Sequence, residues 1–162
     1  MTSEGAAAGL SLRPVRDDDR DFLYRVYAGT RSEELALATD WSPEQKEQFL
    51  RQQFAAQDAY YRENYPGADW SVVLRHGEPA GRLYVHRRPA EIRLMDIALL
   101  PEHRGGGLGT ALLEELMAEA RASGRPLTIH VEVYNPALRL YERLGFRKQE
   151  DKGVYWLMEW TP

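Results

Sequence analysis

Residues 104–110, Arg104-Gly105-Gly106-Gly107-Leu108-Gly109-Thr110, form the segment from which the remainder of the chain can be interpreted. The apolar run 94–100 before it predicts a strand, and the periodic apolar positions of 108–120 predict an amphipathic helix. Glycines allow backbone N–H groups to turn inward together, and the N-terminus of a helix favours an anion. Arg104 adds a positive charge beside these groups. The segment therefore predicts a phosphate-binding loop.

The glycine-rich segment does not match two better-known phosphate-binding loops. A P-loop ends in Gly-Lys and then Ser or Thr, whereas Thr110 and Ala111 follow Gly109 here. A dinucleotide-binding fingerprint would need its third glycine at Leu112 or at Thr110, depending on where it starts. A flexible linker is the remaining alternative, but it would separate a strongly apolar strand from a strongly periodic helix. We therefore favour the anion site.

Composition excludes several classes of protein. The chain has 162 residues, the length of one ordinary domain, and 43% of them are hydrophobic, which is enough for a core. A net charge of −4 gives no support for binding to nucleic acid or to a membrane surface. Cysteine is absent, which excludes disulfides and thiol catalysis, and the four histidines lack metal-ligand spacing. We expect a cytoplasmic, metal-free protein with a flexible tail at 1–9, rather than a signal peptide, and one domain at 10–162.

Hydrophobic periodicity predicts a mixed sheet with helices on its faces, an α+β architecture that is α/β in the loose sense. Ser42, Pro43 and Gln45 suit the first positions of a helix whose inward face would carry Phe49, Leu50 and Phe54. Strands are expected at 10–16, 70–74, 80–86, 91–100, 127–133, 146–149 and 154–160. Helices are expected at 17–30, 43–61, 108–123 and 135–144, with a further helical stretch at 31–41.

Two segments together resemble the GNAT superfamily of acetyl-CoA-dependent N-acetyltransferases. Residues 104–109 fit the family's Arg/Gln-x-x-Gly-x-Gly/Ala diphosphate loop. Residues 135–146 fit its Asn-x-x-Ala-x-x-Leu-Tyr-x-x-x-Gly-Phe segment, with the alanine one place early. The two motifs stand in the family's order, about 30 residues apart, with a helix and a strand between them. The resemblance covers residues 70–160 well and the first 65 residues only in outline.

The resemblance implies a GNAT fold, in which a central, mostly antiparallel twisted sheet carries helices on both faces. Two of its strands, the one before the loop and the one after the helix, would splay apart. Acetyl-CoA would be the cosubstrate, with its diphosphate at 104–110 and its pantetheine paired like an added strand with Ile97, Ala98 and Leu99. The oxyanion donor would be a backbone N–H at Ile97 or Ala98. Asn135 would contact the coenzyme, although it equally suits the cap of a helix.

The resemblance also suggests catalytic groups. Tyr141 stands where the family's tyrosine donates a proton to the departing sulfur, and a phenol with a pKa near 10 can do so at neutral pH. Glu91 lies thirteen residues before Arg104, a spacing at which bacterial acetyltransferases of protein N-termini keep a glutamate assigned as the base. Glu91 could instead be a solvated carboxylate paired with a neighbouring arginine. The alternative bases are Asp96, Glu132 and His130, although Asp96, at the centre of its strand, could instead be a buried structural carboxylate.

The implied function is direct transfer of acetyl to a primary amine in a ternary complex, since no cysteine can carry the acyl group. The amine could belong to a small molecule, a protein or peptide N-terminus, or a lysine. Alternatives are a non-catalytic acyl-CoA-binding sensor or assembly module, a hydroxyl acceptor, or a longer acyl donor. The acceptor wall is expected at 31–41 and the following Gln- and Tyr-rich tract, with Glu33 and Glu34 as either amine-attracting or surface charges. Tyr84 could reach the cleft. We expect no nucleic acid or membrane partner, and the resemblance is compatible with a homodimer.

Overall fold

The computed structural model describes residues 9–162, so the expected tail lies, apart from Gly9, outside the described residues. The strands are β1 (Leu10–Pro14), β2 (Asp69–Arg75), β3 (Glu78–Arg87), β4 (Ile92–Leu99), β5 (Leu127–Glu132), β6 (Arg147–Asp151) and β7 (Tyr155–Trp160). The helices are α2 (Arg20–Ala36), α3 (Pro43–Asn64), α4 (Leu108–Ser123) and α5 (Leu138–Arg143), with 3₁₀ turns η1 (Asp17–Asp19) and η2 (Pro101–His103). Among these described helices, none is long and apolar enough to cross a membrane.

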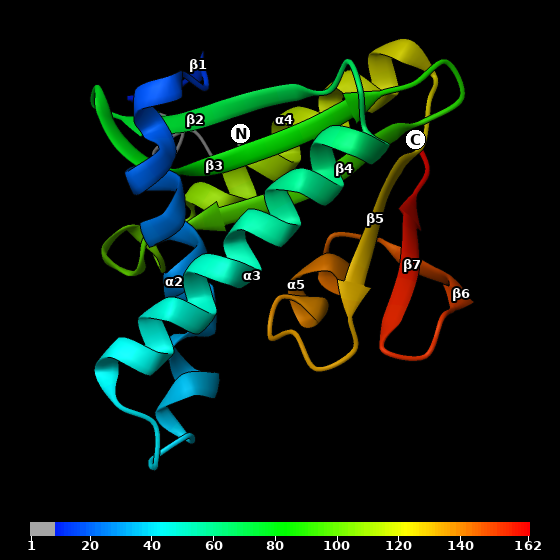
Figure 1. The fold of residues 1–162 in the computed structure, drawn as a ribbon. Coiled ribbons are helices and arrows are strands. Elements are labelled where there is room, and N and C mark those ends of the chain that lie inside the picture. The colour runs from blue at the N-terminus through cyan, green and yellow to red at the C-terminus, as the bar shows by residue number, and fades with distance from the viewer. Residues whose placement is uncertain (1–8) are drawn as a thin grey trace.

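The seven strands form one open sheet in the order β1-β2-β3-β4-β5-β7-β6 (Figure 1). Neighbouring strands run antiparallel, except that β4 and β5 run parallel. Helices α2 and α3 lie on one face of the sheet and α4 lies on the other (Figure 1). This arrangement confirms the expected mixed, mostly antiparallel sheet with helices on both faces.

Local signals in the sequence explain where helix α3 begins, and why α2 and α5 differ from their expected bounds. Ser42 accepts a hydrogen bond from the Gln45 N–H at 3.1 Å, and the Gln45 side chain accepts one from the Ser42 N–H at 2.8 Å, which is the expected capping box. Helix α2 continues to Ala36, past the expected end at 30, because the following residues are good helix formers. Helix α5 begins later than expected, because Asn135 first closes a turn by accepting the Ala137 N–H at 2.8 Å.

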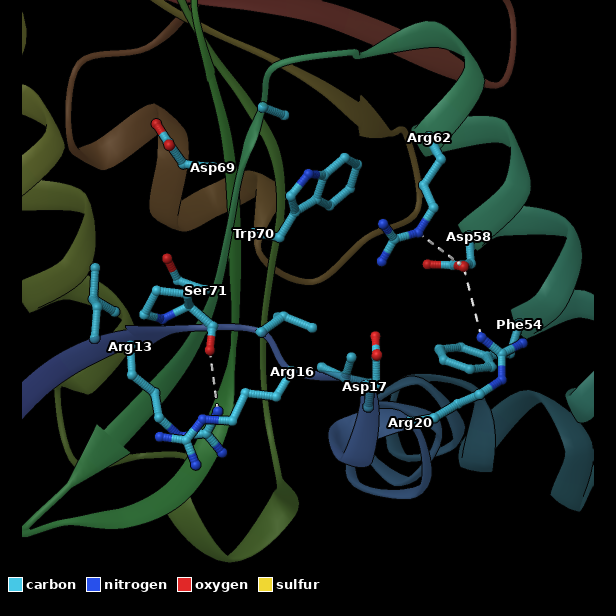
Figure 2. A pocket seen from close by; sticks show the side chains of 15 residues that line it. Arg13, Arg16, Asp17, Arg20, Phe54, Asp58, Arg62, Asp69, Trp70 and Ser71 are labelled. Carbon is cyan, nitrogen blue, oxygen red and sulfur yellow. Dashed lines mark hydrogen bonds and ion pairs between the residues drawn. The ribbon is translucent and has the colours of Figure 1, made fainter.

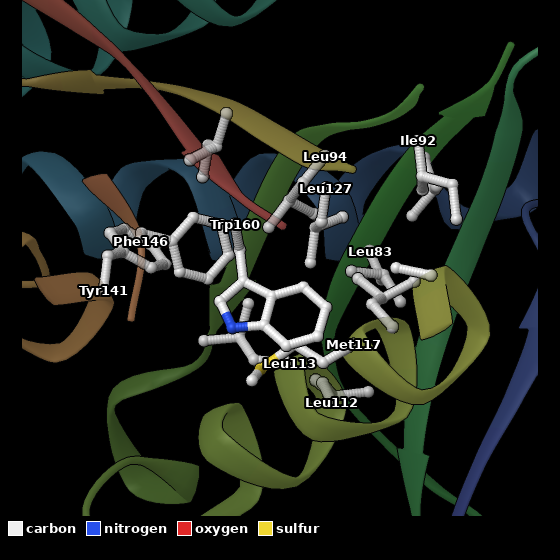
Figure 3. Close-up of a cluster of buried hydrophobic side chains, with 14 of the residues drawn as sticks. Leu83, Ile92, Leu94, Leu112, Leu113, Met117, Leu127, Tyr141, Phe146 and Trp160 are labelled. Carbon is white, nitrogen blue, oxygen red and sulfur yellow. The ribbon is translucent and has the colours of Figure 1, made fainter. Parts of the chain in front are cut away.

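The main core lies between α4 and the sheet. Figure 3 shows Leu112, Leu113 and Met117 of α4 beside strand side chains that include Ile92 and Leu127. These five side chains are each no more than 7% exposed. This packing positions the N-terminus of α4 directly after β4.

A second core fills the space between α2 and α3. Leu50 and Phe54 are buried there as expected. Phe49 is not, because it is 39% exposed and packs edge-on against Trp41 with ring centroids 5.3 Å apart. The expectation for Phe49 was wrong because this end of the α2–α3 hairpin projects beyond the sheet (Figure 1), so no strand lies opposite it.

Candidate active site

The site begins where β4 and β5 separate. These strands pair at three positions, from Ile92 with Leu127 to Leu94 with Ile129. Beyond Leu94, β4 continues to Leu99 and β5 to Glu132 without further pairing between them in the described chain. The expected splay is therefore confirmed, and it leaves one side of the second half of β4 open.

A one-residue bulge at Met95 decides which backbone groups face the opening. Before the bulge, the Ile92 N–H points toward the β5 side and donates to the Pro126 carbonyl at 2.9 Å. The register with β3 then shifts, so that Asp96 pairs with Tyr84 while Leu94 pairs with Val85, which leaves Met95 without a partner of its own. The extra residue reverses the alternation of the strand after it.

After the bulge, the alternation can be followed from β4's last hydrogen bonds. The Leu100 N–H donates to the Ala80 carbonyl of β3 at 2.8 Å. Ala98, two residues earlier, faces β3 in the same way opposite Arg82. Ile97 and Leu99 therefore present their backbone groups to the opening. The expectation that Ala98 could offer its own backbone N–H to a ligand was wrong, because β3 occupies that side.

The glycine loop connects η2 to α4. Gly105 and Gly107 have φ angles of 79° and 81°, which L-residues rarely adopt, so glycine is required at these two positions. Gly107 is the N-cap of α4, and the first helical hydrogen bond runs from the Ala111 N–H to the Gly107 carbonyl at 2.9 Å. The N–H groups of residues 108–110 consequently have no acceptor within the helix. A Cβ added at Gly105 or Gly109 would meet no atom within 4 Å, so the loop borders open space at these two positions.

Arg104 links this loop to the opening between the strands. Its Nε donates to the Leu99 carbonyl at 3.0 Å, and that carbonyl faces the opening. The residue is exposed, so its positive charge remains beside the loop as expected. Glycine amides, a helix N-terminus and a guanidinium therefore meet at one end of β4. This is an arrangement that suits an anion.

Tyr141 lies in α5, against the core on the α4 side of the sheet. It is 4% exposed and packs edge-on against Phe146, with ring centroids 5.6 Å apart (Figure 3). Burial, and to a smaller degree the charge of Asp96, raises the pKa of the Tyr141 phenol. The hydroxyl therefore keeps its proton at neutral pH, which a proton donor requires.

Comparison with known proteins identifies the fold. Residues 34–146, more than half of the chain, match the model of the acetyltransferase (GNAT) family. The chain belongs to the GNAT family of acetyltransferases. An uncharacterized N-acetyltransferase of Bacillus subtilis (strain 168), YycN, is 30% identical over 147 residues, which are 87% of this chain and 94% of the relative.

Two further matches agree with this GNAT assignment. A putative [ribosomal protein bS18]-alanine N-acetyltransferase of Bacillus subtilis (strain 168) is 27% identical over 85% of this chain and 80% of its own. The crystal structure of PaiA N-acetyltransferase from Thermoplasma acidophilum in complex with coenzyme A superposes with a TM-score of 0.69. The superposition covers 94% of this chain and 99% of the PaiA chain. Because the two sequences are only 17% identical, the match supports the fold alone.

Glu91 is not placed as a base in this GNAT chain. It accepts hydrogen bonds from the Thr128 hydroxyl at 2.5 Å and from Arg88 at 3.1 Å, and it pairs with Arg93 at 3.5 Å. Burial raises the Glu91 pKa, but the Thr128 hydrogen bond and the two arginine charges outweigh it and lower the pKa overall. Glu91 also precedes β4 at its paired end, roughly 20 Å from Ile97 at about 3.3 Å per residue. The contact with Arg88 supports the alternative given for Glu91, a carboxylate paired with a neighbouring arginine.

Asp96 and His130, two of the alternative bases, are also committed to other groups. Asp96 pairs with the buried Arg82 at 2.6 Å. His130 Nδ1 lies 3.3 Å from Arg93 Nη1. Because a guanidinium can only donate, Nδ1 accepts this bond and the proton of the neutral ring lies on Nε2. Burial and the Arg93 charge lower the His130 pKa. The ring is therefore neutral, with its acceptor nitrogen already occupied.

Glu132 is the remaining carboxylate at the opening. On β5 it alternates with the core residues Ile129 and Val131, so its side chain faces the α2 side of the sheet. Arg31 of α2 approaches it to 3.7 Å and also pairs with Glu34 at 3.2 Å. Two carboxylates thus share one guanidinium where α2 meets the end of β5.

Three expected site residues occupy other surroundings. The Asn135 side chain accepts a hydrogen bond from the Ala137 N–H in the turn before α5. This contact resembles the helix cap expected for Asn135, but the N-cap of α5 is Ala137, two residues later. Glu33 is exposed on α2. Tyr84 is 3% exposed and contacts both Trp70 and the Arg82 guanidinium. It therefore does not reach the cleft, contrary to the expectation from the sequence.

A cavity of about 620 Å³ lies at the β1–β2 edge of the sheet, between η1 and the second half of α3 (Figure 2). Its lining contains no residue of the glycine loop, β4 or α5. Three of its arginines are already paired, Arg13 with Asp19 at 2.7 Å and Arg20 and Arg62 with Asp58 at 3.6 and 3.3 Å. The cavity is therefore separate from the GNAT site.

Sequence reasoning missed the polar network behind β4, which joins Arg82, Asp96 and Tyr61. Arg82 is 2% exposed within the buried centre of β3. A signal for it does exist in the sequence. Arg82 and Asp96, of opposite charge, interrupt apolar stretches of two neighbouring strands, and such residues are seldom buried unless they are paired.

Proposed function

We propose that this GNAT acetyltransferase transfers acetyl from acetyl-CoA to a primary amine. The observation that carries the proposal is the opening between β4 and β5, which leads to the glycine loop. Backbone groups of Ile97 and Leu99 face this opening, and unbonded amides at 108–110 lie at its end. An extended ligand with amide groups and a terminal diphosphate fits this sequence of sites. Coenzyme A is such a ligand.

Within this proposal, pantetheine amides pair with Ile97 and Leu99 while the diphosphate meets Arg104 and the loop. The neutral amine attacks the thioester carbon and forms the new C–N bond. Charge on the carbonyl oxygen is then stabilised by the Ile97 N–H. The C–S bond breaks as Tyr141 donates its proton to the departing sulfur, and the tyrosine recovers a proton from solvent.

We assign the base to Glu132. Among Glu91, Asp96 and Glu132, it is the one with no ion pair shorter than 3.7 Å, although the exposed Tyr134 also hydrogen-bonds to it. A carboxylate at this place can accept the proton of the acceptor's ammonium, directly or through one water. The neighbouring Glu34 adds negative charge, so a cationic amine is attracted to the same place.

Calorimetry and turnover test the function together. We expect acetyl-CoA to bind and thiol to be released on addition of an amine. The acceptors would be an alanine-starting peptide, chosen for the acceptor that names the Bacillus relative, a lysine peptide, and a small diamine. Tight binding with no turnover would favour a sensor or assembly module. A hydroxyl acceptor and longer acyl donors complete the panel, and preference for either would replace the proposal.

Glu132→Gln tests the base, with Glu91→Gln as the matched control. We expect Glu132→Gln to lower kcat/KM most at neutral pH and less above about pH 9, where an α-amine with a pKa near 8 is already neutral. Glu91→Gln should leave the profile unchanged. Equal profiles for the two variants would pass the base role to water.

A further inference from the structure

The network behind β4 reaches the bulge that shapes the proposed site. The Tyr61 hydroxyl of α3 lies 3.3 Å from the Met95 carbonyl and 3.2 Å from Asp96 Oδ2. Its single proton can serve both acceptors, which flank one peptide bond of the bulge. Asp96 Oδ2 is also bound by Arg82 Nη2 at 2.6 Å. One carboxylate oxygen thus joins a residue of α3 to a residue of β3.

The partners of Asp96 are themselves fixed in place. Arg82 Nη2 also donates to Gln57 of α3 at 2.7 Å, and the Arg82 side chain is 3% exposed. The Tyr61 ring packs edge-on against Tyr84 at 6.0 Å and contacts Trp70 at 6.4 Å between centroids. Burial and the Asp96 charge raise the Tyr61 pKa, so the hydroxyl remains a donor. Neither donor has freedom to follow a shift of β4.

This network lies where the strand changes its alternation. Met95 is the extra residue, and the alternation that places the Ile97 backbone at the opening starts again directly after it. A bulge leaves local backbone groups outside the ladder, so β3 by itself holds this segment less firmly than a regular strand. The Met95 carbonyl has its partner in Tyr61 rather than in a strand.

We infer that Tyr61 is a positioning residue, whose hydroxyl holds the Met95 bulge so that the Ile97 N–H points at the reacting carbonyl. The inference rests on the proposed acetyl transfer and adds a residue from α3 to it. Tyr61 touches neither reactant. It acts through β4, and Asp96 and Arg82 act with it as an anchor rather than as acid or base.

Tyr61→Phe tests the inference, because it removes one oxygen and keeps the ring packing. Tyr60→Phe is the matched control, since Tyr60 is the neighbouring residue on α3 and is 56% exposed. Native-state hydrogen exchange is the first measurement, and it needs no turnover. We expect the Asp96 and Ala98 amides to exchange about tenfold faster in Tyr61→Phe, as for the loss of one hydrogen bond, while the Leu113 amide of α4 is unchanged.

The second measurement is the split between binding and turnover. We expect Tyr61→Phe to lower kcat about tenfold while the Kd for acetyl-CoA stays within about twofold. An equal rise in exchange at Asp96, Ala98 and Leu113 would show general destabilisation and overturn the inference, as would a kcat equal to that of Tyr60→Phe. A wild-type protein without turnover would refute acetyl transfer, and the exchange rates would then decide alone whether Tyr61 holds the bulge.

Discussion

Replacing Gly107 by alanine separates the two demands that the loop places on this residue. The φ angle of 81° is one demand, because it belongs to the left-handed region. The space in front of the loop is the other, because a Cβ added at the neighbouring Gly105 or Gly109 would meet no atom within 4 Å, and we place the diphosphate there. In the free protein the variant therefore suffers backbone strain. In the complex the new methyl group stands where we place the diphosphate.

The two costs have different sizes. A left-handed alanine costs about 1–2 kcal/mol, which corresponds to a fall in Tm of roughly 2–8 °C for a chain of this size. Hydrogen bonds to a charged partner contribute about 1.5–3 kcal/mol each. Losing one of them raises the Kd for coenzyme A by about 10- to 150-fold. We therefore expect a modest loss of stability and a large loss of affinity.

Gly67→Ala is the control for backbone strain. Gly67 has a φ of 82° and a Cβ added there would meet no atom within 4 Å, but it lies in the turn after α3. Gly109→Ala adds the opposite control, since its surroundings are open, its φ is not positive, and the family pattern accepts alanine there. Thermal unfolding should show a similar decrease for Gly67→Ala and Gly107→Ala. Calorimetry should show weak coenzyme A binding for Gly107→Ala alone. If Gly107→Ala binds as tightly as Gly67→Ala, the loop is a connector and the placement of the diphosphate is wrong.

Three further variants probe the buried charges and the phenol. Glu91→Gln should lose about 1–2 kcal/mol at pH 7 in urea unfolding, with kcat unchanged. The pKa of Glu91 is lower in the folded protein than in the unfolded chain. Its stabilisation is therefore present above the unfolded pKa near 4.3 and is lost as the pH falls through the folded pKa. The difference in stability between the variant and wild type should vanish at that low pH. Tyr141→Phe should lower kcat about 100-fold with acetyl-CoA affinity unchanged, and wild-type kcat should show no loss of an acid below about pH 10, because the Tyr141 pKa is raised. Asp96→Asn should cost about 3–5 kcal/mol by leaving Arg82 buried without its counter-charge, and adding Arg82→Met should recover much of it in chemical denaturation.

Short-range features could be predicted from the sequence. The glycine loop, the start of α4 and the capping box at Ser42 each depend on residues within a few positions of one another. The same holds for the segment around Tyr141, whose spacing to Gly145 is local. In these places the chemistry of the backbone allows few alternatives. The local sequence therefore predicts the position of the loop and the start of α4, while the acid role of Tyr141 stays a prediction.

Features that depend on distant partners could not be predicted. Glu91 was interpreted as a base from its spacing to Arg104, and its hydrogen bond with Thr128 of β5 could not be read from that spacing. The assignment of the oxyanion donor stayed open between Ile97 and Ala98 because the bulge that decides it is a mismatch between β3 and β4.

The extra residue at Met95 lets a single strand serve two unlike neighbours. The first half of β4 pairs with β5, and its second half presents unpaired backbone groups on that side. Unpaired groups of this kind on an exposed edge strand can pair with another chain and lead to aggregation. Deleting Met95 would restore unbroken alternation and leave Ile97 and Leu99 facing the opening, but it would remove the carbonyl that Tyr61 contacts. Point substitutions at this position should consequently be tolerated far better than any change in the length of β4.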